Sequence, residues 1–110
     1  MISESDLVES IGPLDADALQ RWIGLGWILP QQDQQNLRFD TSDVARVRLI
    51  CELHYELCIE EDSLTVVLSL MDQLYATRRT LGALAAAVEA QPDHVRDSIA
   101  ALAASTLTPA

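Results

Sequence analysis

The sequence contains no lysine, so its positive charge comes from 7 arginines, which face 17 aspartates and glutamates. The formal net charge is therefore −10. Proteins bind nucleic acid and anionic membranes mainly through Lys and Arg, so this balance disfavours both kinds of partner. It favours instead a basic protein partner.

Long apolar runs are also missing. No stretch approaches the roughly 20 apolar residues that a membrane-spanning helix needs. The first residues carry Glu4, Asp6 and Glu9 without a basic residue, unlike a signal peptide. With 2 cysteines and no secretion signal, we expect reduced thiols and a cytoplasmic protein.

The residues expected of an enzyme are scarce. The chain has only 2 histidines and no glycine-rich phosphate loop, and its carboxylates lie mostly at helix starts and on polar faces. We therefore predict a protein without enzymatic activity and without a cofactor.

Aromatic residues make up only 5% of the chain, whereas hydrophobic residues make up 49%. Much of that hydrophobic fraction is Ala and Leu, which are strong helix formers. A chain of 110 residues suffices for one domain with a real core. The composition predicts a mainly α domain.

Capping residues and glycines predict the first two helices. A short helix is expected over residues 4–10, after the N-cap candidates Ser3 to Asp6. Asp15 caps a second helix, and Gly24 and Gly26 end it, since Gly is common just past a helix C-terminus.

A short hairpin is expected next. Residues 27–29 and 37–39 are apolar and flank a Gln-rich run, so they are predicted as two strands joined by residues 31–36. No Asn-Gly or Asp-Gly pair is present to fix a tight turn.

Three more helices are predicted in the second half. Thr41 or Ser42 caps the third, which runs to about Cys58. The fourth covers about residues 61–90, and the fifth starts at Pro92 and ends near Ala104, before a frayed tail.

The fourth helix has nearly four heptads of apolar residues. A helix of about 30 residues spans roughly 45 Å, which is too long for this domain to cover alone. We therefore expect a second chain to cover it, as a homodimer. The predicted dimerisation residues are Leu64, Val67, Met71, Leu74, Leu81 and Val88, and Ala85 follows the same pattern with Arg78 in the skipped position.

One helix face carries Cys51, His54 and Cys58, with spacings of three and four. These side chains, with His94 as a fourth, are of the types that bind zinc. The alternative is a packing face of small cysteines around a partly satisfied histidine. Because classical zinc spacings are absent, we predict no metal site.

Two groups of residues are candidates for partner binding. Glu52, Glu56 and Glu60 recur every four residues and Asp62 follows, which gives either a stripe that steers a basic partner or an ordinary solvated face. Trp22 and Trp27 are either core residues or, if exposed, anchors of an interface.

The order of these elements resembles the winged helix-turn-helix of the MerR superfamily over about residues 3–75. The residues that carry this resemblance are Gly26, Ile28, Pro30, Arg38-Phe39, Asp43-Val44, Ile50, Leu57 and Ile59. Within that superfamily the chain is most similar to the chaperone-modulator (CbpM-type) family. That similarity rests on residues 23–26, 46–49, 53–57 and above all 67–72.

The resemblance implies a MerR-like winged helix-turn-helix region over 1–60, with a small β-hairpin wing. A long dimerisation helix over 61–91 follows. The resemblance ends near residue 75, so the short C-terminal helix and frayed tail over 92–110 are predicted from the residues alone. The resemblance also implies a function. Proteins of this family bind the J-domain of a DnaJ-like co-chaperone, restrain its stimulation of its heat-shock chaperone and its DNA binding, and dimerise through the long helix. A J-domain presents a basic helix, so an acidic competitor fits it electrostatically.

A DNA-binding transcription regulator is the alternative. Its phosphate contacts would be Arg21, Arg38, Arg46 and Arg48. DNA-binding MerR proteins have a basic residue and tyrosines on the second helix, where this chain has Gln20, Arg21 and Trp22. The wing keeps Arg38 as its only cation. The two hypotheses differ in where the arginines lie: on one exposed face, or scattered and paired with Asp and Glu.

Overall fold

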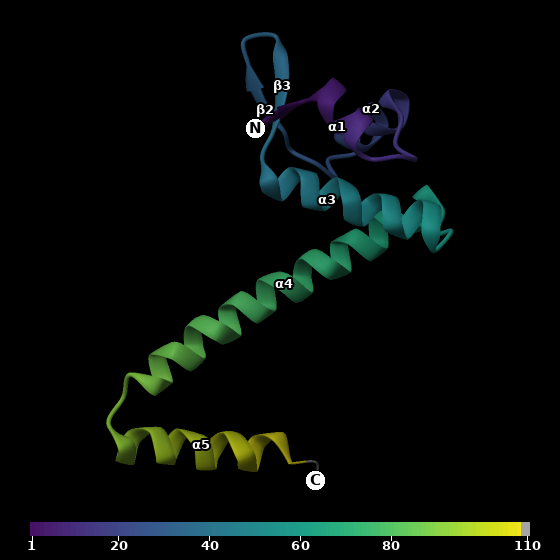
Figure 1. Ribbon diagram of the computed structural model, residues 1–110. Helices are drawn as coiled ribbons and strands as arrows, with labels where there is room; N and C mark the ends of the chain where they lie inside the picture. The colour runs from purple at the N-terminus through teal and green to yellow at the C-terminus, as the bar shows by residue number, and fades with distance from the viewer. Residues whose placement is uncertain (109–110) are drawn as a thin grey trace. The chain divides into compact units, whose positions relative to one another are not determined.

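The computed structural model describes residues 1–108 as a mainly helical chain with a small antiparallel sheet (Figure 1). The prediction of a mainly α protein is confirmed. The chain divides into two compact units, Met1–Ser69 and Leu70–Ala110. The boundary falls inside one long helix, α4 (Glu61–Glu89).

Local capping explains where the first helices begin. Helix α1 (Glu4–Ser10) starts after Ser3, whose hydroxyl accepts a hydrogen bond from the Asp6 amide. Helix α2 (Ala16–Gly24) starts after Asp15, whose carboxylate accepts from the Ala18 amide at 2.7 Å. Gly26 then adopts a φ of +80°, the left-handed conformation that glycine tolerates best.

The sheet has three strands in the order β1-β3-β2, all antiparallel. Strands β2 (Gln31–Asp33) and β3 (Asn36–Phe39) form a hairpin, and β1 (Ile2–Ser3) pairs with the other edge of β3. The second predicted strand is confirmed, but the first was placed wrongly at residues 27–29. Trp27 and Ile28 are buried in a loop, and the strand lies in the Gln-rich run that was predicted as the turn.

Helix α3 (Thr41–Cys51) begins one or two residues earlier than predicted, because its cap is Asp40 and not Thr41 or Ser42. Asp40 and Asp43 form a reciprocal capping box, in which each carboxylate accepts from the other residue's amide. The helix does not continue as an α-helix to Cys58. It changes at Glu52 into a π-helix, η1 (Glu52–Glu56).

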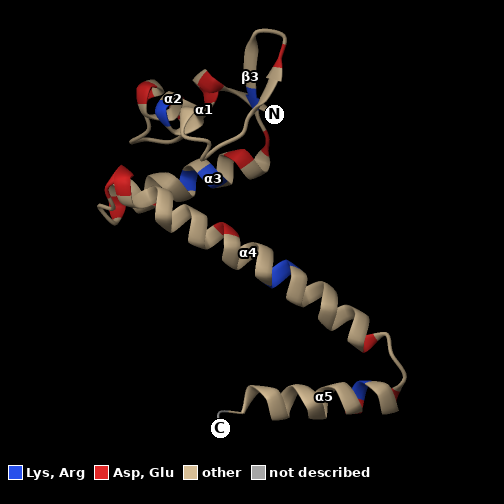
Figure 2. Cartoon of the chain, turned by 180° about the vertical axis from the view of Figure 1, so that it is seen from behind, with Lys and Arg blue, Asp and Glu red and all other residues tan. Residues whose placement is uncertain are grey.

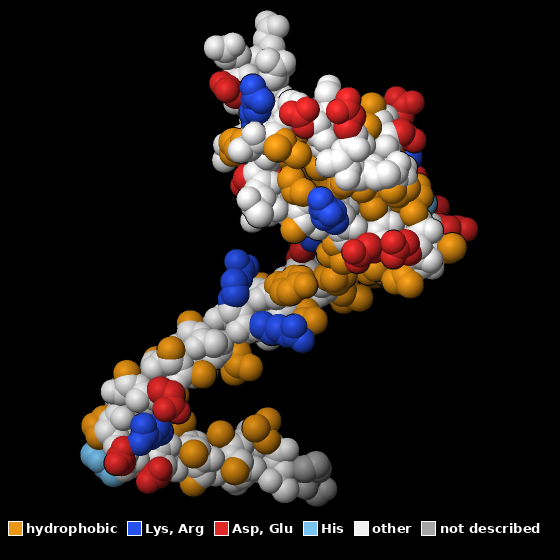
Figure 3. All heavy atoms as spheres, viewed as in Figure 1, with side chains coloured by type: hydrophobic (Ala, Val, Ile, Leu, Met, Phe, Trp, Pro, Cys, Tyr) orange, Lys and Arg blue, Asp and Glu red, His pale blue; other side chains and the backbone are white. Residues whose placement is uncertain are grey.

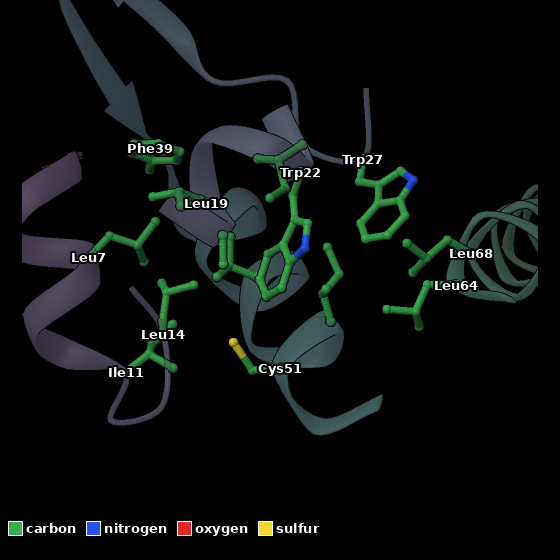
Figure 4. Packing of buried hydrophobic residues seen from close by; sticks show 14 residues of the cluster. Leu7, Ile11, Leu14, Leu19, Trp22, Trp27, Phe39, Cys51, Leu64 and Leu68 are labelled. Carbon is green, nitrogen blue, oxygen red and sulfur yellow. The ribbon is translucent and has the colours of Figure 1, made fainter. Parts of the chain in front are cut away.

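A single core fills the first unit. Figure 4 shows Trp22 in the middle of this core, with residues of α1 and α2 on one side and Trp27 on the other. Leu64 and Leu68, from the start of α4, lie beside Trp27. This arrangement fixes the first two turns of α4 to the first unit.

The second unit contains the rest of α4 and α5 (Asp93–Leu107), joined by a turn at residues 90–92. Helix α5 extends beyond the predicted end at Ala104, and Ser105 is helical rather than frayed. Residues 109 and 110 of the predicted tail lie outside the described part of the chain. Between residues 70 and 108 no residue is buried.

Candidate functional site

An exposed acidic surface surrounds η1 and the start of α4. We call it the acidic edge and define it as Glu52, Glu56, Glu60 and Asp62, all of which are exposed. Figure 2 shows acidic positions gathered along the chain where the α3–η1 segment ends and α4 begins. Leu57 lies within this segment and is 66% exposed. The acidic edge therefore combines negative charge with one protruding apolar side chain.

The backbone of η1 explains why Leu57 is exposed. In the π-helix the Leu57 amide donates to the Glu52 carbonyl, five residues back. Cys58 then adopts a left-handed φ of 57°, which turns the chain sharply. The His54 ring donates from Nδ1 to the Ile59 carbonyl oxygen at 2.8 Å and so closes this turn.

Glu61 joins the acidic edge to helix α2. Its carboxylate accepts hydrogen bonds from Nε and Nη2 of Arg21, at 3.3 and 3.1 Å. It also accepts from Nε1 of Trp22 at 2.8 Å. The hydrogen bond from Arg21 is the main cause that lowers the pKa of Glu61 below its ordinary value of 4.5. One carboxylate thus connects two residues of α2 to the start of α4.

A cluster of aromatic rings lies beneath this connection. Trp22 stacks on Trp27 with ring centroids 6.2 Å apart, and its centroid is 6.3 Å from both His54 and Tyr55. The His54 and Tyr55 rings meet edge to face at 4.8 Å. The cluster holds η1 against α2, and burial is the main cause that raises the pKa of Tyr55.

The two tryptophans predicted as partner anchors are core residues. Trp22 is 0% exposed and Trp27 is 6% exposed. Neither side chain presents a surface to a partner, and the alternative interpretation of both as core residues matches their position. The sequence left both interpretations open, because it does not reveal which side of a helix faces the core.

The Glu61 contacts make the stability of the first unit depend on pH. A carboxyl whose pKa is lower in the folded state adds stability above its unfolded pKa, and that stability is lost as the pH falls through the folded value. Glu61→Gln should therefore destabilise the protein by about 1 kcal/mol at neutral pH, a modest effect because Arg21 is half-exposed. The difference from the parent should shrink as the pH falls below 4.5. Urea denaturation across a pH series, followed by tryptophan fluorescence, measures it.

Glu60→Gln is the matched control, because Glu60 is the adjacent exposed carboxylate. Its stability should follow that of the parent at every pH. A Glu61→Gln variant as stable as the parent at neutral pH would mean that the Arg21 contact contributes nothing to folding.

The four arginines of the DNA-binding hypothesis do not gather on one surface. Arg21 pairs with Glu61, and Arg46 donates from Nε to the Trp27 carbonyl oxygen at 2.9 Å. Arg38 lies on β3 beside a polar cleft next to Ser3 and Glu4, whereas Arg48 lines a separate groove. Each of the four therefore has a different environment.

The groove beside Arg48 borders the acidic edge. It has a volume of about 170 Å³ and is lined by Ile11, Pro13, Arg48, Cys51, Glu52 and Glu56. Apolar atoms of the α1–α2 loop and α3 form part of its surface, and two carboxylates of the acidic edge border it. A long aliphatic side chain with a positive end matches this combination.

The residues considered as zinc ligands do not form a cluster. Cys51 is buried, and burial raises the pKa of its thiol to about 11, whereas Cys58 is exposed on the left-handed turn. His54 already donates to the Ile59 carbonyl. His94 belongs to the other unit. Residues 1–108 contain no group of three side chains placed to hold a metal ion.

The predicted dimerisation residues divide into two groups. Leu64 is 0% exposed and packs in the core of the first unit, so its inclusion in the dimer seam was wrong. Leu74 and Leu81 are 49% and 63% exposed. The remaining three are partly exposed, namely Val67, Met71 and Val88. The apolar seam that is free to meet a second chain therefore begins at Val67.

Two features of this surface escaped the sequence analysis. The contact of Glu61 with Arg21 joins residues 40 positions apart, and no local pattern signals it. A regular α-helix would place Leu57 on the same inward face as Ile50 and Leu53, at spacings of three and four. The π-helix, which the sequence did not reveal, turns it outward instead.

No helix within residues 1–108 has the length and apolar character that a membrane span requires. Comparison with known proteins assigns no family to the chain, since no protein-family model, no curated protein and no solved structure matches it.

Proposed function

We propose that this protein is a non-enzymatic modulator that binds the J-domain of a DnaJ-like co-chaperone and restrains its activity. It acts as a homodimer, and its binding site is the acidic edge. The observation that supports this proposal most is the position of Leu57, an exposed apolar side chain among exposed carboxylates. A basic helix with an apolar residue is the complement of such a surface.

The roles within the site follow from its geometry. The carboxylates at Glu52 and Glu56 attract the basic helix, and Leu57 supplies the apolar anchor. The groove beside Glu52 accepts the aliphatic part of a partner lysine or arginine, whose charge meets the carboxylates at the rim. The aromatic cluster and Glu61 keep this surface rigid, which reduces the entropy lost on binding.

The winged helix-turn-helix assignment is part of the same proposal. It is supported by the order of helix α2, the β2–β3 hairpin and helix α3 along the chain. In this arrangement the hairpin is the wing. The residues of the acidic edge follow α3 in the sequence. A partner that binds them therefore does not use the surface through which winged helices bind DNA.

Reversing two charges of the acidic edge tests the proposal. Glu52→Lys with Glu56→Lys should slow association with the J-domain roughly tenfold at low salt, because charges at a rim mainly set the association rate. The parent's association should itself slow as salt rises. Surface plasmon resonance against the J-domain encoded in the same genome measures both rates, and circular dichroism checks that the helix content is unchanged.

The control carries the same change of net charge elsewhere. Glu9→Lys with Asp33→Lys alters two exposed acids of α1 and β2 and should bind almost as fast as the parent. Leu57→Ser should instead raise the dissociation rate. If the Glu52 and Glu56 variant binds as fast as the parent across the salt series, the acidic edge is only a solvated face and the proposed site is wrong.

DNA binding should be weak or absent at physiological salt. Non-specific DNA binders reach Kd values of about 10⁻⁴ to 10⁻⁶ M through several phosphate contacts. Here Arg21 is paired with Glu61, and Arg46 donates to a backbone carbonyl. A mobility-shift assay with duplex DNA should show no complex below micromolar protein concentration. Nanomolar binding to any duplex would favour the transcription-regulator alternative.

A further inference from the structure

Helices α4 and α5 each have an apolar stripe that residues 1–108 leave largely uncovered. On α4 the stripe contains Val67, just before the boundary between the units, and Leu70, Leu74, Leu81, Leu84 and Val88. At about 100° per residue these side chains span an arc of about 100°, and Met71 widens it to about 140°. Thr77 and Arg78 are the polar residues within it. A two-stranded coiled coil uses a narrower seam, so this stripe is wide enough for two neighbouring helices.

Helix α5 has a stripe of similar width. It consists of Val95, Ile99, Leu102, Ala103, Thr106 and Leu107, which span about 140°. Of its large apolar side chains, Leu102 is 68% exposed and Leu107 is 81% exposed. The space-filling view shows apolar side chains at the surface of both helices (Figure 3). Soluble proteins rarely leave apolar patches of this kind exposed unless another molecule covers them.

Both stripes contain a hollow of the shape that receives a side chain from a facing helix. The α4 hollow is lined by Ala76, Thr77, Thr80, Leu81 and Leu84. The α5 hollow is lined by Ile99, Leu102, Ala103, Thr106 and Leu107. Each hollow includes residues at positions i, i+3, i+4 and i+7. In coiled-coil packing, four residues at these positions form the hole that receives one side chain of the facing helix.

The character of these stripes indicates a second copy of the chain as the occupant. No charged residue occurs between Thr80 and Val88 or between Ser98 and Thr108, so identical surfaces meet without repulsion over these two segments. The same absence leaves nothing to select a charged partner of another kind. Each chain also offers both leucine knobs and hollows, which is the self-complementarity that a two-fold interface needs.

Helix α5 does not cover its own α4. Leu81 and Leu84 remain 63% and 61% exposed although α5 belongs to the same unit. An ion pair between Glu89 and Arg96, at 3.6 Å, spans the turn between the two helices. Both stripes of one chain therefore remain available to another chain.

We propose that two copies form a four-helix core in which the α5 stripe of each copy covers the α4 stripe of the other. Every helix then contacts two neighbours, as the width of both stripes requires. This inference rests on the homodimer of the proposed function and extends its interface from α4 to α5.

Leu102→Asp tests the role of α5 in the full-length protein. A buried unpaired charge should weaken the dimer by about 100-fold or more in sedimentation equilibrium. Ala101→Asp, which lies on the opposite side of α5, should leave the dimer constant within about threefold. A dimer unchanged by Leu102→Asp would overturn the proposal, and so would a parent protein that sediments as a monomer.

Disulfide trapping tests the exchange between chains. In a Cys58→Ser background, a Thr80→Cys chain is mixed with a differently sized Ala103→Cys chain and oxidised. A disulfide between the two sizes supports the proposal. If the Thr80→Cys, Ala103→Cys double variant forms this bond only within one chain, α5 covers its own α4 and the proposal is wrong.

J-domain binding separates this inference from the proposed function. The acidic edge lies in the first unit, so the Leu102→Asp variant should still bind the J-domain. A normal dimer that fails to bind any J-domain would contradict the proposed function and leave the four-helix core intact.

Discussion

Leu64→Ala is expected to destabilise the first unit by about 2–5 kcal/mol while leaving the dimer constant unchanged. Leu64 is fully buried and lies beside Trp27 in the core, although it belongs to the helix whose later residues face outward. Truncating it removes buried methyl groups and leaves a cavity. Chemical denaturation followed by tryptophan fluorescence measures the loss, since both tryptophans belong to this core.

Val66→Ala is the matched control. Val66 is two residues further along the same helix and 60% exposed, so its truncation should change the stability by less than about 0.5 kcal/mol. A Leu64→Ala protein with unchanged stability but a weaker dimer would place Leu64 in the seam that its spacing first indicated.

The fourth helix illustrates what a heptad pattern leaves undetermined. Val67 follows Leu64 by three residues, which fits a heptad pattern, so the sequence predicted that both belong to one apolar face of the helix. At about 100° per residue, however, Leu64 and Leu68 lie on nearly the opposite side of the helix from Leu84. The start of α4 packs into its own unit through one face, and a different face is exposed later.

Helix starts were predictable because their signals are local. Ser3 and Asp15 cap the next helices through hydrogen bonds to amides three residues later. Gly26 provides the left-handed residue after α2. Such contacts need only neighbouring residues, so the sequence suffices to place them.

The hairpin was harder to place because its strands are polar. Trp27 and Ile28 have high strand propensity, yet tertiary packing buries them in a loop. The strand instead begins at Gln31, and Gln34 adopts the left-handed φ of 58° that glycine or asparagine usually provides. Local residue propensities predict neither the burial of Trp27 and Ile28 in a loop nor a strand that begins at Gln31.

The candidate site depends on contacts that no spacing encodes. The acidic residues were visible as a cluster in the sequence. The pairing of Arg21 with Glu61 was not, because the two residues are 40 positions apart. The exposure of Leu57 depends on one π-helical turn. The sequence therefore predicted the charge of the surface and missed its exposed apolar residue, Leu57.

Leu74→Asp is expected to convert the proposed dimer into a monomer whose first unit remains folded. Leu74 lies in the apolar stripe of α4, near its middle, and is 49% exposed in the single chain. In a dimer through this stripe the new carboxylate would be buried without a partner, which costs several kcal/mol and lowers the affinity by at least about 100-fold. Sedimentation velocity over a concentration series measures the change.

The first unit should remain folded in the Leu74→Asp variant, because residue 74 lies beyond the last α4 residue of its core. The last α4 residue buried in that core is Leu68, and the unit itself ends at Ser69. Tryptophan fluorescence should therefore keep its native spectrum in the monomer. Ala83→Asp adds the same charge on the other side of α4 and should leave the dimer intact. If the Leu74→Asp protein remains a dimer as tight as the parent, the chains associate through another surface, and the exposed leucines of α4 require a different partner.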